Sequence, residues 1–180
     1  MQNTNTENIV LGGGCFWCIE AIFQQLRGVV KVTSGYAGGD MTDPTYHQVS
    51  AGTSGHAEVV QVEFNPKEIS FADIITVFFT MHNPTTVNQQ GNDIGSQYRS
   101  IILYTQPEQL PIINKIKQQF IAEHIYSHPI VTDIQPLTQF YPAENYHQNY
   151  YATNSSQPYC QVVISPKLAK LKAKYAKLLK

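Results

Sequence analysis

The spacing of hydrophobic and polar residues along the chain predicts alternating strands and helices. Apolar and polar positions alternate over 60–64, within a predicted strand over 57–64 that has one buried face. Ser70 is a suitable N-cap and Asn83-Pro84 a helix breaker, and together they predict a helix over 70–82. The other expected strands cover 8–11, 29–34, 98–104 and 130–134, and the other expected helices cover 15–26, 107–126 and 143–151.

Glycine-rich and polar stretches separate these elements. We expect the stretch 35–39 to end the second strand, and 40–55, 88–97 and much of 137–160 to form loops. Across residues 8–104 the order is strand, helix, two strands, helix, strand, as in the split βαβ unit. We therefore expect an α+β fold, a two-layer sandwich with a ferredoxin-like βαββαβ core, a mixed and mainly antiparallel sheet, and an extended C-terminal region.

The C-terminal end carries a second periodic pattern. Four large side chains recur at spacings of three and four, which predicts an amphipathic helix over about 166–180. They are Leu168, Leu171, Tyr175 and Leu178. Ser165-Pro166 provides an N-cap and a first helical residue. Six of the twelve basic residues lie in the last fourteen positions, so this helix either docks with a solvated lysine face or binds a membrane surface or an anion.

Composition narrows the class of protein. The 180 residues carry a net charge of −1, form one domain by length, and show no repeats or low-complexity linker. There is no basic, apolar leader at the start and no run of eighteen apolar residues, so neither secretion nor a membrane span is expected. Basic residues gather at one end rather than over a face, which disfavours nucleic-acid binding. Three cysteines without a leader indicate a soluble, cytoplasmic protein with reduced thiols.

Cys15 is the strongest candidate nucleophile. It follows Gly12-Gly13-Gly14 and opens a predicted helix, so free backbone N–H groups and the positive helix end lie near its sulfur. Both effects favour the thiolate, which is the nucleophilic form. The alternative, a buried and inert cysteine, is less consistent with a place directly after three glycines.

Cys18 lies three residues after Cys15 and completes a C-x-x-C motif. Such a pair indicates a thioredoxin-like dithiol, half of a zinc site, or a nucleophile with a helper thiol. Zinc needs two more ligands, and the chain offers only Cys160 and scattered histidines. His56-Ala57-Glu58 resembles part of a zinc-deaminase signature, but in that signature the C-x-x-C follows the H-x-E.

Glu58 is the most informative acid. On the predicted strand it shares the core-facing side with the apolar residues, so desolvation should raise its pKa and keep it protonated as a proton donor. Tyr46 and Tyr98 lie in polar surroundings, and their hydroxyls could hold a polar oxygen near that carboxyl. Phe16-Trp17 could form one wall of a small apolar pocket beside the nucleophile.

Several ordered motifs resemble those of the A-type peptide methionine sulfoxide reductases. The resemblance runs from about residue 9 to residue 160, nearly the whole chain. The motifs are Gly14-Cys15-Phe16-Trp17, Gly35-Tyr36-Ala37-Gly38-Gly39, Pro44-Thr45-Tyr46, Gly55-His56-Ala57-Glu58-Val59-Val60, the stretch Gln90-Gly91-Asn92-Asp93-Ile94-Gly95-Ser96-Gln97-Tyr98-Arg99-Ser100, and Ala143-Glu144-Asn145-Tyr146-His147-Gln148.

The resemblance implies a role for each matching residue. Cys15 would be the nucleophile, while Phe16 and Trp17 would bind the substrate methyl group. The implied oxygen-holding residues are Glu58, Tyr46 and Tyr98, and the implied substrate-seating residues are Asp93 and His147. The family reduces the S epimer of methionine sulfoxide, free or in proteins, and so repairs oxidative damage. It takes its electrons from thioredoxin, for which dithiothreitol can substitute, and needs no metal, flavin or nucleotide.

The chain departs from the family pattern in its other thiols. Many members end in a Gly-rich tail with two cysteines, whereas this chain has Cys160 alone, and Cys18 where many members have none. Asn83 stands where aspartate is more usual. We expect a sulfenic acid on Cys15 that Cys160 resolves from a mobile segment, with Cys18 as a relay or as the alternative resolving thiol.

Two functions of other classes remain open from the residues alone. A thioredoxin-like carrier would use Cys15 and Cys18 to reduce generic disulfides and would not need Glu58. A non-catalytic binding module would use the lysine-rich helix and the aromatic loop, with all its thiols inert.

Overall fold

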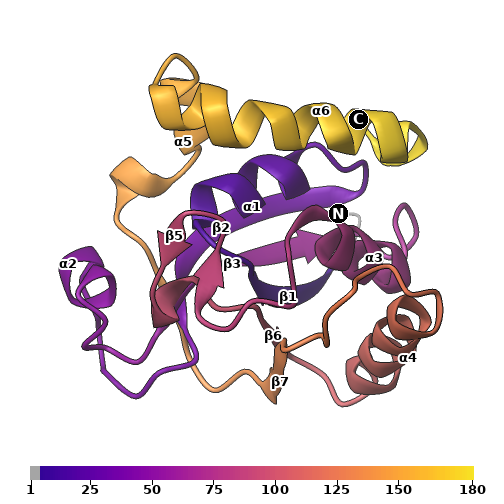
Figure 1. The fold of residues 1–180 in the computed structure, drawn as a ribbon, viewed down its shortest axis with the longest axis horizontal. Coiled ribbons are helices and arrows are strands. Elements are labelled where there is room, and N and C mark those ends of the chain that lie inside the picture. Colours follow the sequence, from indigo (N-terminus) through magenta and orange to yellow (C-terminus); the bar gives the residue numbers. More distant parts are fainter. Residues whose placement is uncertain (1–4) are drawn as a thin grey trace.

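A curled six-stranded sheet forms the centre of the molecule (Figure 1). The computed structural model describes residues 5–180. The strand order is β7-β6-β1-β3-β2-β8. The bounds of these strands, in chain order, are β1 Glu7–Gly12, β2 Val29–Ala37, β3 Ala57–Phe64, β6 Ile101–Tyr104, β7 Asp133–Pro136 and β8 Phe140–Pro142.

The pairing is antiparallel at every contact in this sheet except one. Strand β1 pairs with β3 and β6, and β2 pairs with β3 and β8, all antiparallel. Only β6 and β7 run parallel. The expected mixed, mainly antiparallel sheet is therefore confirmed.

Residues 5–180 form six α-helices. They are α1 Phe16–Gln24, α2 Tyr46–Ser50, α3 Phe71–Met81, α4 Gln109–Ala122, α5 Tyr150–Asn154 and α6 Ser165–Tyr175. Helices α1, α3 and α6 contribute to the large apolar core on one face of the sheet. The opposite face holds a smaller cluster that includes Val10, Val59 and Leu103, with Leu137 and Phe140 packed against it. The helices thus lie mainly to one side.

The clearest sequence patterns form the elements they predicted. Strand β3 has the expected bounds, and its side chains Glu58, Val60 and Phe64 are all buried. Ser70 caps α3 by accepting a hydrogen bond of 3.0 Å from the N–H of Asp73. These patterns succeed because local preference and tertiary burial favour the same conformation.

Three stretches expected to be irregular contain regular structure, so those expectations were wrong. Strand β2 continues through Gly35 to Ala37, because β3 and β8 pair with it on both sides. Helix α2 lies inside the expected loop 40–55 and begins with a capping box between Thr45 and Gln48. The expected loop 88–97 contains a short hairpin, β4 Gln89–Gln90 with β5 Asp93–Ile94.

Several elements begin or end at other residues than expected. The helix expected over 143–151 is wrong, because that stretch forms the 3-10 turn Asn145–His147 and only the start of α5 at Tyr150. The strand predicted for 98–104 begins only at Ile101, because Ser96–Tyr98 forms a 3-10 turn. The strand predicted for 130–134 is β7, which lies about three residues later where β6 offers it a parallel partner. The helix predicted for 107–126 is shorter at both ends.

The region from 137 to 164 is more ordered than the sequence indicated. It holds β8, a 3-10 turn Asn145–His147, α5 and a π-helical turn Cys160–Ile164. The π-helical turn runs directly into α6, so Ser165 does not act as an N-cap. Its hydroxyl instead hydrogen-bonds that of Tyr151 at 2.8 Å.

Helix α6 packs against the rest of the protein, which agrees with the first of the two interpretations of the lysine-rich end. Leu171 is fully buried, and Figure 1 shows α6 lying alongside α1. Two contacts join it to α3: the Tyr175 and Thr80 hydroxyls lie 2.7 Å apart, and Lys170 Nζ donates to the Thr80 carbonyl at 3.0 Å. Across residues 5–180, none of the helices combines the length and the apolar character that crossing a bilayer requires.

Candidate active site

Cys15 lies at the N-cap of α1, outside the helix proper. Its φ of −59° and ψ of 128° are extended rather than helical. Gly14 before it has a φ of +96°, which side-chain-bearing residues rarely adopt. At Gly13 a Cβ atom would lie 2.9 Å from the ring of His82. The glycines therefore allow a sharp turn and a close approach that place Cys15 at the start of the helix.

The carboxyl of Glu58 occupies the start of α1 beside Cys15. Its Oε2 accepts a hydrogen bond of 3.0 Å from the N–H of Phe16. Glu58 is only 2% exposed, and burial raises its pKa to about 8 despite this hydrogen bond. A carboxyl with that pKa is largely protonated at neutral pH. The predicted burial and raised pKa of Glu58 are confirmed.

The thiols of Cys15 and Cys18 interact, and they differ in acidity. Burial raises the pKa of the Cys15 thiol well above its usual value, and the hydrogen bond with Cys18 and the charge of Glu58 add to the effect. The pKa of Cys18 falls to about 7, chiefly because the Cys15 thiol hydrogen-bonds its sulfur and also because Lys167 lies nearby. The helix-start N–H of Trp17 acts in the opposite direction and lowers the pKa of Cys15, as the sequence led us to expect, but burial outweighs it. The N–H of Phe16 is directed to Glu58 instead.

Tyr159 connects the C-terminal region to both thiols. Its hydroxyl lies 3.6 Å from the sulfur of Cys18 and donates a hydrogen bond of 2.8 Å to the carboxylate of Asp93. Its ring also packs edge-on against Trp17, at a centroid distance of 6.0 Å. When Cys18 is a thiolate, the hydroxyl can donate its one hydrogen to that sulfur in place of Asp93, and this contributes to the low pKa of Cys18. Sequence reasoning missed Tyr159, and only its place directly before Cys160 could have drawn attention to it.

Aromatic rings form one wall of the site. Trp17 stacks on Tyr150 with ring centroids 3.7 Å apart, and its indole N–H donates to Nδ1 of His147 at 3.1 Å. Phe16 lies 5.0 Å from the His147 ring, measured between centroids. Buried Glu20 fixes the chain here by accepting the N–H groups of Asn149 and Tyr150.

Glu144 holds two tyrosines near the site. Its carboxylate accepts a hydrogen bond of 2.9 Å from the Tyr36 hydroxyl and one of 3.1 Å from the N–H of Tyr46. The Tyr46 ring in turn lies 4.4 Å from that of His147, between centroids. Glu144 was not among the candidate residues, although it lies next to His147 in the same motif.

Tyr46 and Tyr98 keep neutral hydroxyls. Burial raises the pKa of both phenols, and the charges of Glu58 and Cys15 raise them further. The structure therefore brings the predicted residues Cys15, Glu58, Tyr46 and Tyr98 into one electrostatic environment. Neutral hydroxyls can donate hydrogen bonds to a bound oxygen.

Cys160 does not lie on a mobile loop, contrary to expectation. It is fully buried in the π-helical turn before α6, within the same apolar core as Cys15 and Cys18. Burial raises the pKa of Cys160, and the charge of Cys18 on α1, which packs against this turn, adds to the effect. All three cysteines are free thiols. Over residues 5–180, no three His, Cys, Asp or Glu side chains gather in a way that would hold a metal ion.

A buried pair of interacting thiols beside a protonated carboxyl has the groups that cysteine-dependent oxidoreductases use. Comparison with known proteins narrows this class. The family described as Peptide methionine sulfoxide reductase matches residues 7–179, so the chain belongs to that family. It is accordingly an oxidoreductase of the peptide-methionine (S)-S-oxide reductase class.

Individual relatives agree with this assignment. A Peptide methionine sulfoxide reductase MsrA from Polynucleobacter asymbioticus is 51% identical over 173 residues, 96% of this chain and 91% of the relative. The structure of reduced Mxr1 from Saccharomyces cerevisiae aligns with a TM-score of 0.80 and 34% identity, over 88% of this chain and 91% of that one. Mxr1 in complex with Trx2 aligns with a TM-score of 0.57 and 27% identity, over 83% and 87% of the two chains.

Proposed function

We propose that the enzyme reduces the S epimer of methionine sulfoxide, free and in proteins, with Cys15 as nucleophile and Glu58 as proton donor. The observation that carries this proposal is the Glu58 carboxyl, with a pKa of about 8, bonded to the N–H that follows Cys15. A carboxyl that keeps its proton at neutral pH can give it to a sulfoxide oxygen.

The reduction proceeds with this chain's own groups. The Cys15 sulfur attacks the sulfoxide sulfur while the Glu58 proton passes to the sulfoxide oxygen. That oxygen ends on Cys15 as the hydroxyl of a sulfenic acid, and the thioether of methionine leaves. The proton that Cys15 loses returns to Glu58, so a thiol and a sulfoxide become a sulfenic acid and a thioether.

Two tyrosines and four further residues complete the proposed site. The hydroxyls of Tyr46 and Tyr98 hold the substrate oxygen, which their neutral state favours. Phe16 and Trp17 contact the methyl group of the substrate. Asp93 and His147 seat the rest of it, and the buried position of His147 beside Trp17 supports that role.

A second thiol then captures the sulfenic acid, forming a disulfide and releasing water. The contacts favour Cys18 over Cys160 for this step, the reverse of the order that the sequence suggested. Cys15 is extended at the N-cap, so a Cys15–Cys18 bond does not have to bend a helix interior. Cys18 also has a pKa of about 7, which keeps much of it as thiolate at neutral pH. Cys160, which lies in the turn that packs against α1, can accept the disulfide next and act as the relay.

Thioredoxin closes the cycle in this proposal, by dithiol exchange with the enzyme disulfide. The structural relationship to Mxr1, which has been solved in complex with Trx2, supports this choice of reductant. The three free thiols fit a cytoplasmic enzyme, since thioredoxin keeps thiols reduced there. No metal or other resident cofactor takes part in the proposed cycle, and neither a membrane nor a nucleic acid is a partner.

The proposal extends to the fold. We infer that residues 1–180 act as one catalytic domain built on a ferredoxin-like core. Support comes from four strands in the order β6-β1-β3-β2, antiparallel throughout, which is the order of the split βαβ unit.

The decisive experiment separates the two epimers. The enzyme is incubated with dithiothreitol and either the S or the R epimer of dabsyl-methionine sulfoxide, and the dabsyl-methionine formed is measured. We expect turnover of the S epimer alone. Insulin disulfides serve as the control substrate, because a thioredoxin-like carrier would reduce them. Turnover of the R epimer, or insulin reduction without sulfoxide reduction, would contradict the proposal.

A further inference from the structure

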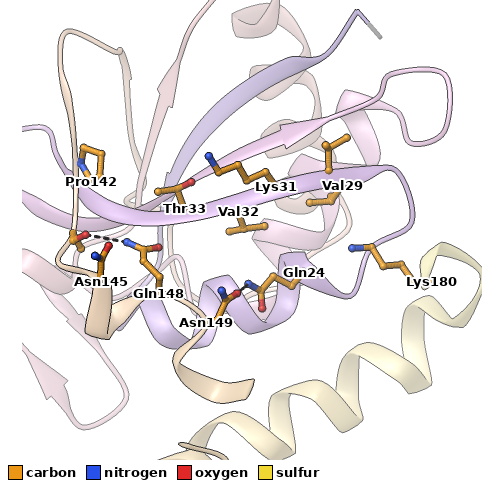
Figure 2. A pocket seen from close by; sticks show the side chains of 12 residues that line it. Gln24, Val29, Lys31, Val32, Thr33, Pro142, Asn145, Gln148, Asn149 and Lys180 are labelled. Carbon is orange, nitrogen blue, oxygen red and sulfur yellow. Dashed lines mark hydrogen bonds between the residues drawn. The ribbon is translucent and has the colours of Figure 1, made fainter. Parts of the chain in front are cut away.

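A cavity of about 570 Å³ lies along the outer edge of β2, and none of the three cysteines lines it. Figure 2 shows it between this strand and the segment that runs from Pro142 to Asn149. From Figure 2, Lys31 lies on one side of the strand, while Val32 lies on the other side with Gln24 and Asn149. The cavity therefore follows a strand edge rather than the face of a helix.

The edge of β2 is closed at one end of the cavity and open along the rest. Strand β8 pairs with β2 only from Gly35 to Ala37. At Ser34 the carbonyl accepts the N–H of Ala143 at 2.8 Å and Nε2 of Gln148 at 2.9 Å, while the Ser34 N–H donates to Oε1 of Gln148 at 2.9 Å. A side chain thus completes the ladder at its last paired position.

Beyond Ser34 no element covers the edge. Peptide groups alternate in direction along a strand, so Val32 directs its N–H and C=O to the same edge as Ser34. Among residues 5–180, nothing forms a hydrogen bond with those two groups on that side. Val30, in the irregular part of the strand, has a side chain that is 63% exposed. The cavity consequently presents unpaired backbone groups next to apolar surface.

The side chains that line the cavity favour an acidic occupant. Lys31 and Lys180 both line it, and no aspartate or glutamate side chain does, so Lys31 carries the positive charge that the α-carboxylate of Lys180 does not offset. Glu63 lies opposite Lys31 on β3, but the two form no ion pair within 4.0 Å. The two ammonium groups are therefore available to carboxylates of a bound chain.

We propose that this β2 edge is a docking site for an acidic, extended segment of an oxidised protein substrate. The segment adds to the sheet antiparallel to β2, in line with β8, and its peptide groups pair with those of Val32. Its acidic side chains meet Lys31 and Lys180. The inference rests on the proposed function, because it assigns the docked chain to the same substrates.

The site and the cavity share one wall, which supports a substrate rather than an unrelated partner. The segment 143–150 contributes Glu144 and His147 to the active site and Gln148 and Asn149 to the cavity. A second copy of the enzyme is a poorer occupant. The register shift between Val29 and Lys31 breaks the regular edge that symmetric strand pairing needs.

Binding is tested first, with the full chain and fluorescein-labelled peptides at low ionic strength. The probe is Glu-Val-Glu-Val-Glu with blocked ends, followed by fluorescence anisotropy. Its counterparts are Lys-Val-Lys-Val-Lys and the Glu peptide N-methylated at alternate residues, which cannot pair with a strand edge. We expect the Glu peptide to bind at least about tenfold more tightly than either counterpart. Equal binding of the N-methylated peptide would overturn strand addition.

The variant Lys31→Glu then tests the place of binding, with Lys115→Glu on α4 as the matched control. We expect Lys31→Glu, but not Lys115→Glu, to weaken binding of the Glu peptide by about tenfold. For a methionine sulfoxide peptide extended by the Glu segment, Lys31→Glu should raise KM, while turnover of dabsyl-methionine sulfoxide stays unchanged in both variants.

Several results would overturn the inference without touching the proposed function. These are equal peptide binding by Lys31→Glu, an unchanged KM for the acidic substrate, or sedimentation showing a dimer that Lys31→Glu dissociates. The last would assign the edge to a second copy. A different result would contradict the proposed function itself: the protein binds the Glu peptide tightly but reduces neither epimer of methionine sulfoxide. In that case the bound chain could no longer be identified as a substrate.

Discussion

The indole N–H of Trp17 donates to Nδ1 of His147, and this fixes which ring nitrogen of His147 keeps its hydrogen. Nδ1 is an acceptor here, so Nε2 carries the proton of the neutral ring. Burial lowers the pKa of His147 and so favours this neutral form. Nε2 is buried and has no hydrogen-bond partner among the described residues. A buried donor without a partner is costly unless a ligand completes it.

We therefore expect His147→Phe to raise KM for methionine sulfoxide by about tenfold or more, because it removes the donor that we propose binds substrate and also leaves the Trp17 N–H unpaired. Steady-state kinetics with the dabsyl substrate measure this. His128→Phe, an exposed histidine near the end of α4, is the control and should match the unmodified enzyme. An unchanged KM in His147→Phe would show that Nε2 does not bind substrate.

Cys15→Ser should abolish sulfoxide reduction and leave the fold intact. A serine hydroxyl occupies the same N-cap position but is not a nucleophile toward sulfoxide sulfur at neutral pH. The measurement is turnover with dithiothreitol, together with a circular dichroism spectrum and a urea unfolding curve. Turnover above background in a folded Cys15→Ser enzyme would mean that another thiol performs the attack.

Glu58→Gln should slow the single-turnover rate by roughly 10²–10⁴, since an amide cannot supply the proton. In the unmodified enzyme the pKa of Glu58 is raised to about 8, and the protonated form is the active one. The rate should therefore fall as pH rises through about 8 and beyond. Rapid-quench measurements from pH 6 to about pH 10 should show this alkaline limb in the unmodified enzyme and not in Glu58→Gln. A limb that persists in the variant would assign it to another group.

Tyr159→Phe should raise the pKa of Cys18 from about 7, because the variant lacks the hydroxyl that lies 3.6 Å from the Cys18 sulfur. The measurement is the pH dependence of iodoacetamide alkylation, with the modified cysteine identified by mass spectrometry. At neutral pH, Cys18 should then react more slowly. Tyr151→Phe, whose hydroxyl bonds Ser165 instead, is the matched control. If the pKa of Cys18 is the same in Tyr159→Phe as in the unmodified enzyme, then the Tyr159 hydroxyl does not influence the Cys18 thiol.

One equivalent of substrate, given without a reductant, should leave a disulfide that includes Cys15 and Cys18. We expect the same bond in Cys160→Ser, while Cys18→Ser should accumulate sulfenic acid or form a Cys15–Cys160 bond more slowly. Peptide mapping by mass spectrometry distinguishes these products. If Cys18→Ser forms the Cys15–Cys160 bond as fast as the unmodified enzyme forms its first disulfide, then Cys160 is the resolving thiol. The proposed order, in which Cys18 reacts before Cys160, would then be wrong.

The sequence predicted those parts of the site that local pattern determines. Alternation along β3 placed Glu58 among buried apolar residues, and the glycines placed Cys15 at a helix start. Helix α2 was missed although a local signal exists, because Thr45 and Gln48 have the spacing of a capping box.

Other contacts depend on residues far apart in the chain, and no local pattern carries them. Tyr159 meets Asp93 across 66 positions, and Glu144 meets Tyr36 across 108. The acidity of the two thiols likewise depends on burial and on the hydrogen bond between them, and the N–H of Phe16 bonds Glu58, which comes from a distant strand. Only the folded chain shows which acceptor receives a helix-start N–H group.

The π-helical turn that contains Cys160 continues without a break into α6. At its middle and its far end this helix is joined to α3 by Lys170 and Tyr175 respectively. A new covalent bond at Cys160 must therefore displace the first turn of α6, or strain its attachment to α3. Oxidised and reduced enzyme would then differ in the amide hydrogen-exchange rates of a helix that touches no substrate. The amide exchange rates of α6 would therefore indicate whether Cys160 has formed a disulfide during the catalytic cycle.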